Sequence, residues 1–224
     1  MREIVLDTET TGLDPASGDR VVEIGCVELL NHVPSGQTRQ YYINPERDMP
    51  EEAFKVHGLS SEFLAGQPRF AEIAEDFLAF VREDTLVIHN AEFDIKFLNA
   101  ELARLGHSPI PMTQAVDTVA MARRRFPGAQ ASLDALCRRF DIDLSVRSLH
   151  GALLDCQLLA AVYLELRGGR QPGLTLDSQA SGGTSRVVGV TRRYREPRQH
   201  APSEAEIAAH ERMLDSLKEP LWRN

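Results

Sequence analysis

The sequence predicts a mixed α/β fold, in which helices flank a central sheet. Three apolar, strand-like segments come first, and strands then alternate with helices up to about residue 169. Consecutive strands favour an antiparallel meander, whereas alternating strands and helices add strands to the sheet through helical connections. After residue 169 the apolar periodicity weakens, so we expect a flexible C-terminal tail.

The first half of the chain contains three expected strands, at residues 4–9, 21–30 and 38–43. A loop with short helical turns separates them from a helix expected at residues 70–81. In that helix the apolar residues recur with the period of an amphipathic helix. They are Phe70, Ile73, Ala74, Phe77, Leu78 and Val81.

The second half alternates between short apolar strands and longer helical patterns. Ser132 is the expected N-cap of one helix, and Gly168 with Gly169 ends the last one. The expected elements are a strand at 86–89, a helix at 93–105 ended by Gly106, a short strand around Val116, and helices at 118–125, 132–140 and 151–167.

Length, charge and cysteine content narrow the class of protein. A chain of 224 residues fits one sizeable domain with an appendage. No run approaches the roughly 20 apolar residues of a membrane helix, and Met1 leads almost directly into a core strand, so we expect no signal peptide and a cytoplasmic location. Cys26, Cys137 and Cys156 lack zinc-like spacing and fit buried thiols in a reducing compartment. The net charge of −8 disfavours a protein that coats nucleic acid, but not an enzyme that holds a few nucleotides at a metal-loaded cleft.

Two carboxylates close the first expected strand. Asp7 and Glu9 follow an apolar run, and side chains two residues apart on a strand project from the same face. Neighbouring carboxylates in an apolar setting repel each other and lose hydration unless a cation neutralises them. A divalent metal site is therefore the leading interpretation, and a solvated strand end is the alternative.

Two further carboxylates belong to helices. Asp94 falls in the first turn of the helix that follows the strand at 86–89, and Asp155 lies in the last core helix, shortly after His150. The four carboxylates together offer only oxygen ligands, which favours Mg²⁺ or Mn²⁺ over zinc.

Three short motifs resemble those of the DEDDh family of 3′→5′ exonucleases: Asp7-Thr8-Glu9, Asn90-x-x-Phe93-Asp94 and His150-x-x-x-x-Asp155. Further segments resemble the epsilon-type proofreading subunits of bacterial DNA polymerase III: Val56-His57-Gly58 and residues 126–137, 206–211 and 221–223. Residues 179–202 match least. The resemblance implies a ribonuclease H-like sheet with the active site at its central strand, and an exonuclease domain over residues 1–169.

The resemblance implies hydrolysis of the terminal phosphodiester with two divalent cations, Mg²⁺ or Mn²⁺. We assign Asp7, Glu9 and Asp155 to one cation and Asp94 to the other, and the division of carboxylates between the two stays open. His150 is the expected general base. Imidazole titrates near neutral pH, whereas a carboxylate that holds a metal is a poor base.

By resemblance, a set of residues contacts the terminal nucleotide of a DNA 3′ end. Within it, His57 is equally well an ordinary turn histidine, and Asn90, like His89, is equally well a strand-end residue. The set comprises Asp7, Glu9, Thr10, Thr11, Gly12, Leu13, Glu52, His57, Asn90, Phe93 and Asp155. The remaining histidines show no partner pattern and are expected at the surface: His32, His107, His200 and His210.

The tail divides into three parts. Residues 170–177 resemble the peptide that docks in a sliding clamp, through Gln171, Leu174 and Leu176. Residues 178–202 are polar and rich in arginine, and we expect a flexible linker. Residues 203–224 carry a helical apolar stripe too short to form its own core, so we expect this segment to bind the polymerase. Its expected contact residues are Ile207, Met213, Leu214, Leu217 and Trp222.

The partners implied by the resemblance are a DNA 3′ end, the alpha catalytic subunit of polymerase III, the beta sliding clamp and a small theta-like subunit. The leading function is the removal of mispaired 3′-terminal nucleotides during replication. One alternative is a free-standing nuclease that trims single-stranded DNA or RNA, which needs no tail such as residues 170–224. Another is a catalytically inactive scaffold, which has no reason to keep four mutually repelling acids.

Overall fold

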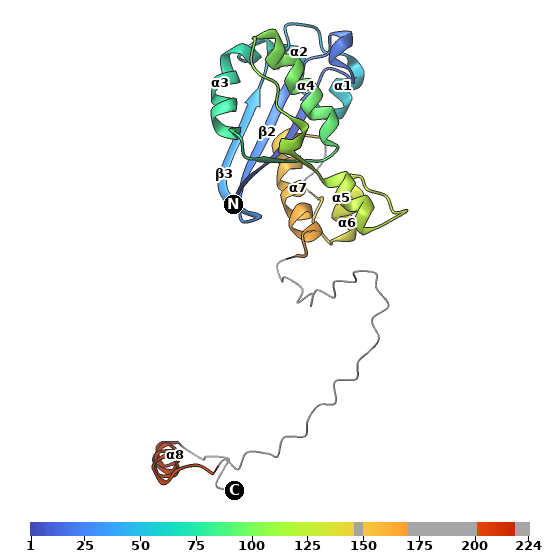
Figure 1. Ribbon diagram of the computed structural model, residues 1–224. Helices are drawn as coiled ribbons and strands as arrows, with labels where there is room; N and C mark the ends of the chain where they lie inside the picture. The colour runs from blue at the N-terminus through green and yellow to red at the C-terminus, as the bar shows by residue number, and fades with distance from the viewer. Residues whose placement is uncertain (146–149, 170–200, 218–224) are drawn as a thin grey trace, which may run out of the picture. The chain divides into compact units, whose positions relative to one another are not determined.

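Five strands form one mixed sheet, and the first strand in sequence lies at its centre (Figure 1). The structure is a computed structural model that describes residues 1–145, 150–169 and 201–217. The strand order is β3-β2-β1-β4-β5, with β1 antiparallel to β2 and parallel to β4, which confirms the mixed α/β prediction. The strands are β1 Arg2–Thr10, β2 Val21–Leu30, β3 Val33–Tyr42, β4 Thr85–Ile88 and β5 Ala115–Asp117.

The helices begin and end close to their expected positions. Ser132 is confirmed as an N-cap, because its hydroxyl accepts a hydrogen bond from the amide of Ala135 at 3.3 Å. The expected loop with helical turns contains two short helices, α1 and α2. The helices are α1 Glu51–His57, α2 Ser61–Ala65, α3 Phe70–Val81, α4 Ala91–Arg104, α5 Thr118–Arg125, α6 Leu133–Arg139, α7 Ala152–Leu166 and α8 Glu204–Ser216, with 3-10 turns at Pro15–Ser17 and Met112–Gln114.

The prediction of a third strand at residues 38–43 is wrong at its start, because β3 begins at Val33. A tight turn with positive φ at Asn31 and His32 joins it directly to β2. The first part of β3 contains Pro34 and is exposed, so it lacks the apolar alternation of a half-buried strand. An edge strand tolerates proline, because one row of its backbone groups faces water.

Two apolar cores lie on opposite faces of the sheet. Along β1, Ile4 and Leu6 pack toward α3 and α4, whereas Val5 packs toward α5, α6 and α7. Because side chains alternate along a strand, Asp7 shares the face of Val5. Figure 1 places α7 against the sheet, with α5 and α6 beside it. Asp7 therefore projects toward the helix that carries Asp155.

His32 was expected at the surface without a partner, but it is half-buried and has partners. Its Nδ1 lies 2.6 Å from a carboxylate oxygen of Glu3, and its ring meets the ring of Tyr163 edge-on. The hydroxyl of Tyr163 also donates to Glu3, at 2.7 Å. Glu3 is only 1 % exposed, so it needs these donors from the β2–β3 turn and from α7. His107 is half-buried and His210 is exposed, while His200 lies outside the described residues.

Helix α8 belongs to a second, C-terminal unit of the chain, separate from the unit that contains the sheet. Ser203 caps this helix, with its hydroxyl accepting from the amide of Glu206, so the helical stripe expected in residues 203–224 forms a helix at Glu204–Ser216. On it, Leu214 is buried while Ile207, Met213 and Leu217 are exposed. The other tail residues singled out by the sequence lie outside the described residues: Gln171, Leu174, Leu176, Trp222 and linker residues 178–200. None of the helices within the described ranges is both long and apolar enough to cross a bilayer.

Candidate active site

The end of β1 brings two carboxylates to the face of the sheet that α7 covers. Glu9 is 8 % exposed, and Asp7 is half-buried. Gly25 stands opposite Asp7 in the antiparallel register with β2. A Cβ on Gly25 would lie 2.4 Å from the backbone carbon of Ala152, so only glycine allows the first turn of α7 to approach the sheet this closely.

That first turn of α7 carries Asp155, which is 4 % exposed. Its Oδ2 lies 3.2 Å from Nδ1 of His150. One ligand atom from each of Glu9, His150 and Asp155 lies within 4.8 Å of the others. The backbone of His150 is held by α1, because its N–H donates to the carbonyl of Val56 at 3.1 Å. Residues far apart in the sequence thus lie close together at the end of β1.

Asp94 approaches the same strand from the opposite face. It is 3 % exposed and lies in the first turn of α4. The hydroxyl of Thr8 donates to its Oδ1 at 2.7 Å. Helix α4 follows Asn90, which has a left-handed backbone conformation with φ of 70°. The N–H of Asn90 donates to the carboxylate of Asp117. Thr8 was assigned no role in the sequence analysis, and the signal that could have identified it is the alternation along the strand, which turns Thr8 to the face opposite Asp7.

The carboxylates perturb one another strongly. Burial raises the pKa of Asp7 well above its usual range, and the charges of Asp94, Glu9 and Asp155 raise it further. Burial also raises the pKa of Asp94 to about 7, against an opposing hydrogen bond from Thr8. A hard divalent cation fits this donor set, because it prefers carboxylate oxygens and neutralises charge that the buried site otherwise disfavours.

Glu23 is a fifth acid of the site, and it was missed in the sequence analysis. It stands opposite Glu9 in the β1–β2 register and is 2 % exposed. Burial raises its pKa, while its hydrogen bonds, including those from the backbone amides of Ala152 and Leu153, oppose that shift. Glu23 therefore caps the start of α7, where the helix dipole favours negative charge. The available signal was a single acid inside the apolar segment 21–27.

The residues expected around the terminal nucleotide differ in their exposure and in their contacts. In the loop after β1, the hydroxyl of Thr10 donates to the carbonyl of Gly12 at 2.6 Å. Phe93 packs on Phe97, with ring centroids 4.9 Å apart. Glu52 lies in the first turn of α1, and no hydrogen bond or ion pair within the described residues joins it to the carboxylates. Thr10, Thr11, Gly12 and Phe93 are buried or half-buried, whereas Leu13, Glu52 and Asn90 are exposed.

His57 ends α1 and is 6 % exposed. Its Nδ1 accepts from the amide of Leu59 at 3.1 Å, and its buried Nε2 has no hydrogen-bond partner among the residues that the structure describes. Burial lowers its pKa, a backbone interaction with Thr10 opposes that shift, and the nearby His150 adds to it. His57 thus lies beside His150 and near the backbone of Thr10 at the end of β1.

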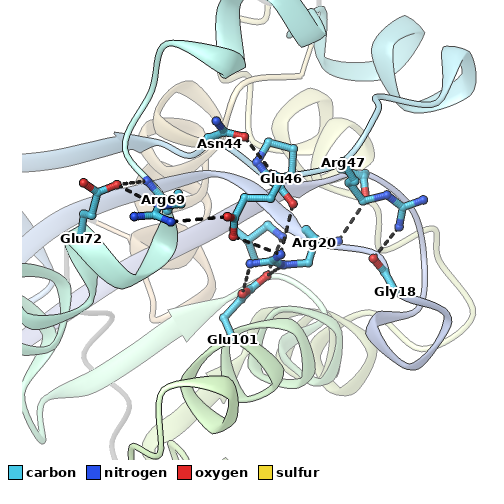
Figure 2. Close-up of polar contacts among 11 residues, drawn as sticks. Gly18, Arg20, Asn44, Glu46, Arg47, Arg69, Glu72 and Glu101 are labelled. Carbon is cyan, nitrogen blue, oxygen red and sulfur yellow. Dashed lines mark hydrogen bonds and ion pairs between the residues drawn. The ribbon is translucent and has the colours of Figure 1, made fainter.

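Ion pairs hold the loop between β1 and β2, which contains Thr11, Gly12 and Leu13 of the residues expected around the terminal nucleotide (Figure 2). Arg20 forms a bidentate salt bridge with the buried Glu101 of α4, with Nε–Oε1 at 2.6 Å and Nη2–Oε2 at 2.9 Å. Arg47 donates to Asp19 at 2.9 Å. The Asp19 carboxylate lies against Gly12, where a Cβ would come within 2.3 Å of it. The conformation of this loop is therefore set before any substrate arrives.

A cleft of about 780 Å³ opens beside the carboxylates and extends toward α5 and α6. His89 lies in its wall. Its Nδ1 donates at 2.9 Å to the hydroxyl of Thr118, because that hydroxyl donates in turn to the carbonyl of Ile88. The lining residues are Asp7, His89, Asn90, Val119, Arg123, Ala129, Gln130, Ala131, Ser132, Leu133, Asp134, His150 and Asp155.

The sequence matches the family model described as Exonuclease over residues 4–163. Curated relatives named DNA polymerase III subunit epsilon match as well. The one from Rickettsia prowazekii (strain Madrid E) is 59 % identical over 174 residues, which is 76 % of each chain. The one from Escherichia coli (strain K12) is 42 % identical over 237 residues, covering 99 % of this chain and 97 % of that relative.

Solved structures share the fold. The nuclease domain of 3′hExo, described as a DEDDh family member bound to rAMP, has a TM-score of 0.64 at 18 % identity and covers 75 % of this chain and 92 % of its own. Exonuclease X in complex with 5′ overhanging duplex DNA has a TM-score of 0.59 at 24 % identity, over 74 % and 90 % of the two chains. These matches confirm the ribonuclease H-like sheet. Because the Exonuclease model spans most of the domain and an epsilon relative matches nearly the whole chain, this chain belongs to the exonuclease family, among the epsilon subunits of DNA polymerase III.

Proposed function

We propose that this chain removes mispaired nucleotides from DNA 3′ ends, as the proofreading exonuclease of a bacterial replicative polymerase in the cytoplasm. The observation that carries the proposal is the gathering of four carboxylates and one histidine from β1, α4 and the start of α7 around one strand end. The names and near-complete coverage of the epsilon relatives support the same function.

In this proposal the acids hold two divalent cations, Mg²⁺ or Mn²⁺. Asp7, Glu9 and Asp155 bind one and Asp94 binds the other. When bound, such cations stabilise the charge on the attacking and leaving oxygens of the phosphodiester. Thr8 keeps Asp94 in place through its 2.7 Å hydrogen bond, and Gly25 lets α7 bring Asp155 to the strand. A two-cation site also explains why buried acids with raised pKa values are packed together.

His150 is the proposed general base. Its Nδ1 lies 3.2 Å from Asp155, which favours the tautomer with the proton on Nδ1 and leaves Nε2 as the basic nitrogen. Nε2 then accepts a proton from the water that attacks the phosphorus. The side chain of His150 is half-exposed at the cleft, so substrate and water can reach it.

The terminal nucleotide is proposed to bind where β1, α1 and the start of α4 meet. The loop Thr10–Leu13 contacts its sugar and phosphate, with the exposed Leu13 against the base. His57 donates from Nε2, because its Nδ1 already accepts from the backbone. Phe93, Glu52 and Asn90 complete this subsite.

The tail is proposed to tether the nuclease to its partners. Residues 203–224, with Ile207, Met213 and Leu217 exposed on α8, bind the alpha catalytic subunit together with Leu214 and Trp222. Gln171, Leu174 and Leu176 bind the beta clamp, and a small theta-like subunit is a further partner. The match of the Escherichia coli relative to 99 % of this chain includes the tail, which a free-standing nuclease does not need. A scaffold without activity is disfavoured because all five catalytic positions are intact.

Digestion of two primers that differ only in the pairing of the 3′-terminal base tests the proposed function. With Mg²⁺, the mispaired primer should be shortened roughly tenfold faster, because unstacking one paired step costs about 1.4 kcal/mol. The polymerase alpha subunit should increase this preference, and EDTA should abolish the digestion. The same two strands without template serve as the control and should be cut at equal rates. Digestion confined to RNA would contradict the proposal.

Removal of all residues after Arg170 should abolish association with the polymerase alpha subunit and leave single-strand digestion intact. The domain up to residue 169 has both of its cores, whereas α8 has too few apolar residues for a core of its own. Gel filtration with alpha measures the association. The double variant Gln171→Ala/Leu174→Ala is the control: it should lose binding to the clamp only. A truncated chain that still co-elutes with alpha would refute the tether.

A further inference from the structure

We propose that the arm of the cleft between the carboxylates and the α5–α6 region binds the sugar-phosphate backbone of the DNA strand that leads into the active site, with Arg123 as its main phosphate contact. This inference rests on the proposed function and extends it, because it assigns a place to the second nucleotide from the 3′ end.

The direction of the strand follows from two positions. The proposed terminal-nucleotide residues lie in the loop after β1, at the end of α1 and at the start of α4. Of that group, Thr10–Leu13, Glu52, His57 and Phe93 are absent from the described lining of the cleft, and the exposed Asn90 is shared. The cleft instead starts at Asp7 and Asp155 and extends to α5 and α6. A strand whose scissile phosphate lies at the carboxylates and whose last nucleoside lies on one side of them must leave on the other.

The chemistry of the arm fits a phosphodiester. Arg123 is exposed at its edge, and within the described residues it forms no hydrogen bond or ion pair. Its guanidinium can bind two phosphate oxygens at once. Gln130 adds amide donors, and the hydroxyl of Ser132, which accepts from Ala135, retains its own proton to donate.

One acid opposes this attraction, and its charge is compensated. Asp134 lines the same arm, but its Oδ2 lies 3.8 Å from a guanidinium nitrogen of Arg138. The described lining contains no phenylalanine, tyrosine or tryptophan on which bases could stack. Recognition through the backbone is therefore expected, and it is independent of base sequence.

Two substrates distinguish the contribution of the arm from that of the catalytic centre. The p-nitrophenyl ester of thymidine 5′-monophosphate has one nucleotide and no strand, whereas a ten-residue oligothymidylate fills the arm. The measured quantity is the ratio of kcat/KM for the oligonucleotide to kcat/KM for the ester. Arg123→Gln should lower this ratio about tenfold, the effect of one charge-assisted phosphate contact. It should also flatten the salt dependence of oligonucleotide cleavage by roughly 0.7 in the log–log slope.

Arg124→Gln is the matched control, since Arg124 is exposed on the same helix but is not part of the cleft lining. It should keep the wild-type ratio, and Arg123→Lys should recover part of the loss. If the ratio is unchanged for Arg123→Gln, or falls equally for Arg124→Gln, the proposed binding of the strand by the arm is overturned. Failure of the wild-type chain to hydrolyse either substrate would instead overturn the proposed function.

Discussion

Asp7→Asn should abolish Mg²⁺-dependent exonuclease activity, so that the residual activity lies below the detection limit of a gel assay. Asp7 lies at the centre of the acid cluster, and the charges of Asp94, Glu9 and Asp155 all raise its pKa. An amide at this position removes a shared carboxylate, while the shape of the side chain is kept. Asp155→Asn should have the same effect. Wild-type-like digestion by either variant would contradict the assignment of these acids to metal binding.

The same substitution should raise the stability of the metal-free protein, which separates a loss of chemistry from a loss of fold. A group whose pKa is higher in the folded state favours folding below its unfolded pKa, and this contribution is lost as the pH rises through the folded pKa. For Asp94 the loss extends from about pH 4 to beyond the folded pKa of about 7. Burial and the neighbouring acids also raise the pKa of Asp7 in the folded state. At pH 8 in EDTA, Asp7→Asn should therefore melt a few degrees higher than the wild type.

Added Mg²⁺ should reverse that order, because binding to the folded state stabilises the wild type and not the variant. Thermal melts with EDTA and with Mg²⁺ measure both effects. Asp48→Asn replaces an exposed aspartate outside the cluster and should change neither melt. A metal-free Asp7→Asn protein less stable than the wild type would show that the cluster does not repel itself.

Periodicity predicted most of the fold and part of the site. The period of two along β1 placed Asp7 and Glu9 on one face, and the helical period of α3 gave its bounds without error. The predicted start of β3 was wrong, because an edge strand needs no apolar alternation and tolerates a proline such as Pro34. Local pattern therefore predicts elements with at least one buried face, and it fails where neither face of a strand is buried.

Contacts made across the sheet were beyond the reach of the sequence pattern. Gly25 and Glu23 matter because β2 pairs with β1 in a register that sets them against Asp7 and Glu9. His32 has a buried partner only because its turn brings it to Glu3. The cleft likewise forms because α5 and the α6 region lie beside Asp7, His150 and Asp155, which belong to other parts of the chain. Each of these depends on tertiary pairing, which no window along the chain contains.

His150→Gln should lower turnover by roughly 10²–10⁴-fold, the effect of a lost general base. Glutamine can still donate a hydrogen bond to Asp155, but it accepts no proton at neutral pH. Single-turnover rates on an oligonucleotide at saturating Mg²⁺ measure the effect. His107→Gln, which alters a half-buried histidine 3.6 Å from Glu75 and outside the site, should leave turnover unchanged.

The structure also offers a competing role for His150, since its ring lies within 4.8 Å of ligand atoms on Glu9 and Asp155 and could itself hold a cation. The two roles predict different responses to metal. If His150 is the base, the His150→Gln protein should be stabilised by Mg²⁺ and Mn²⁺ as much as the wild type, and extra metal should not restore its rate. If His150 is a ligand, the variant should need more metal for the same melting shift, and raising the Mn²⁺ concentration should recover activity. The second pattern would remove the general-base assignment while leaving the carboxylate site intact.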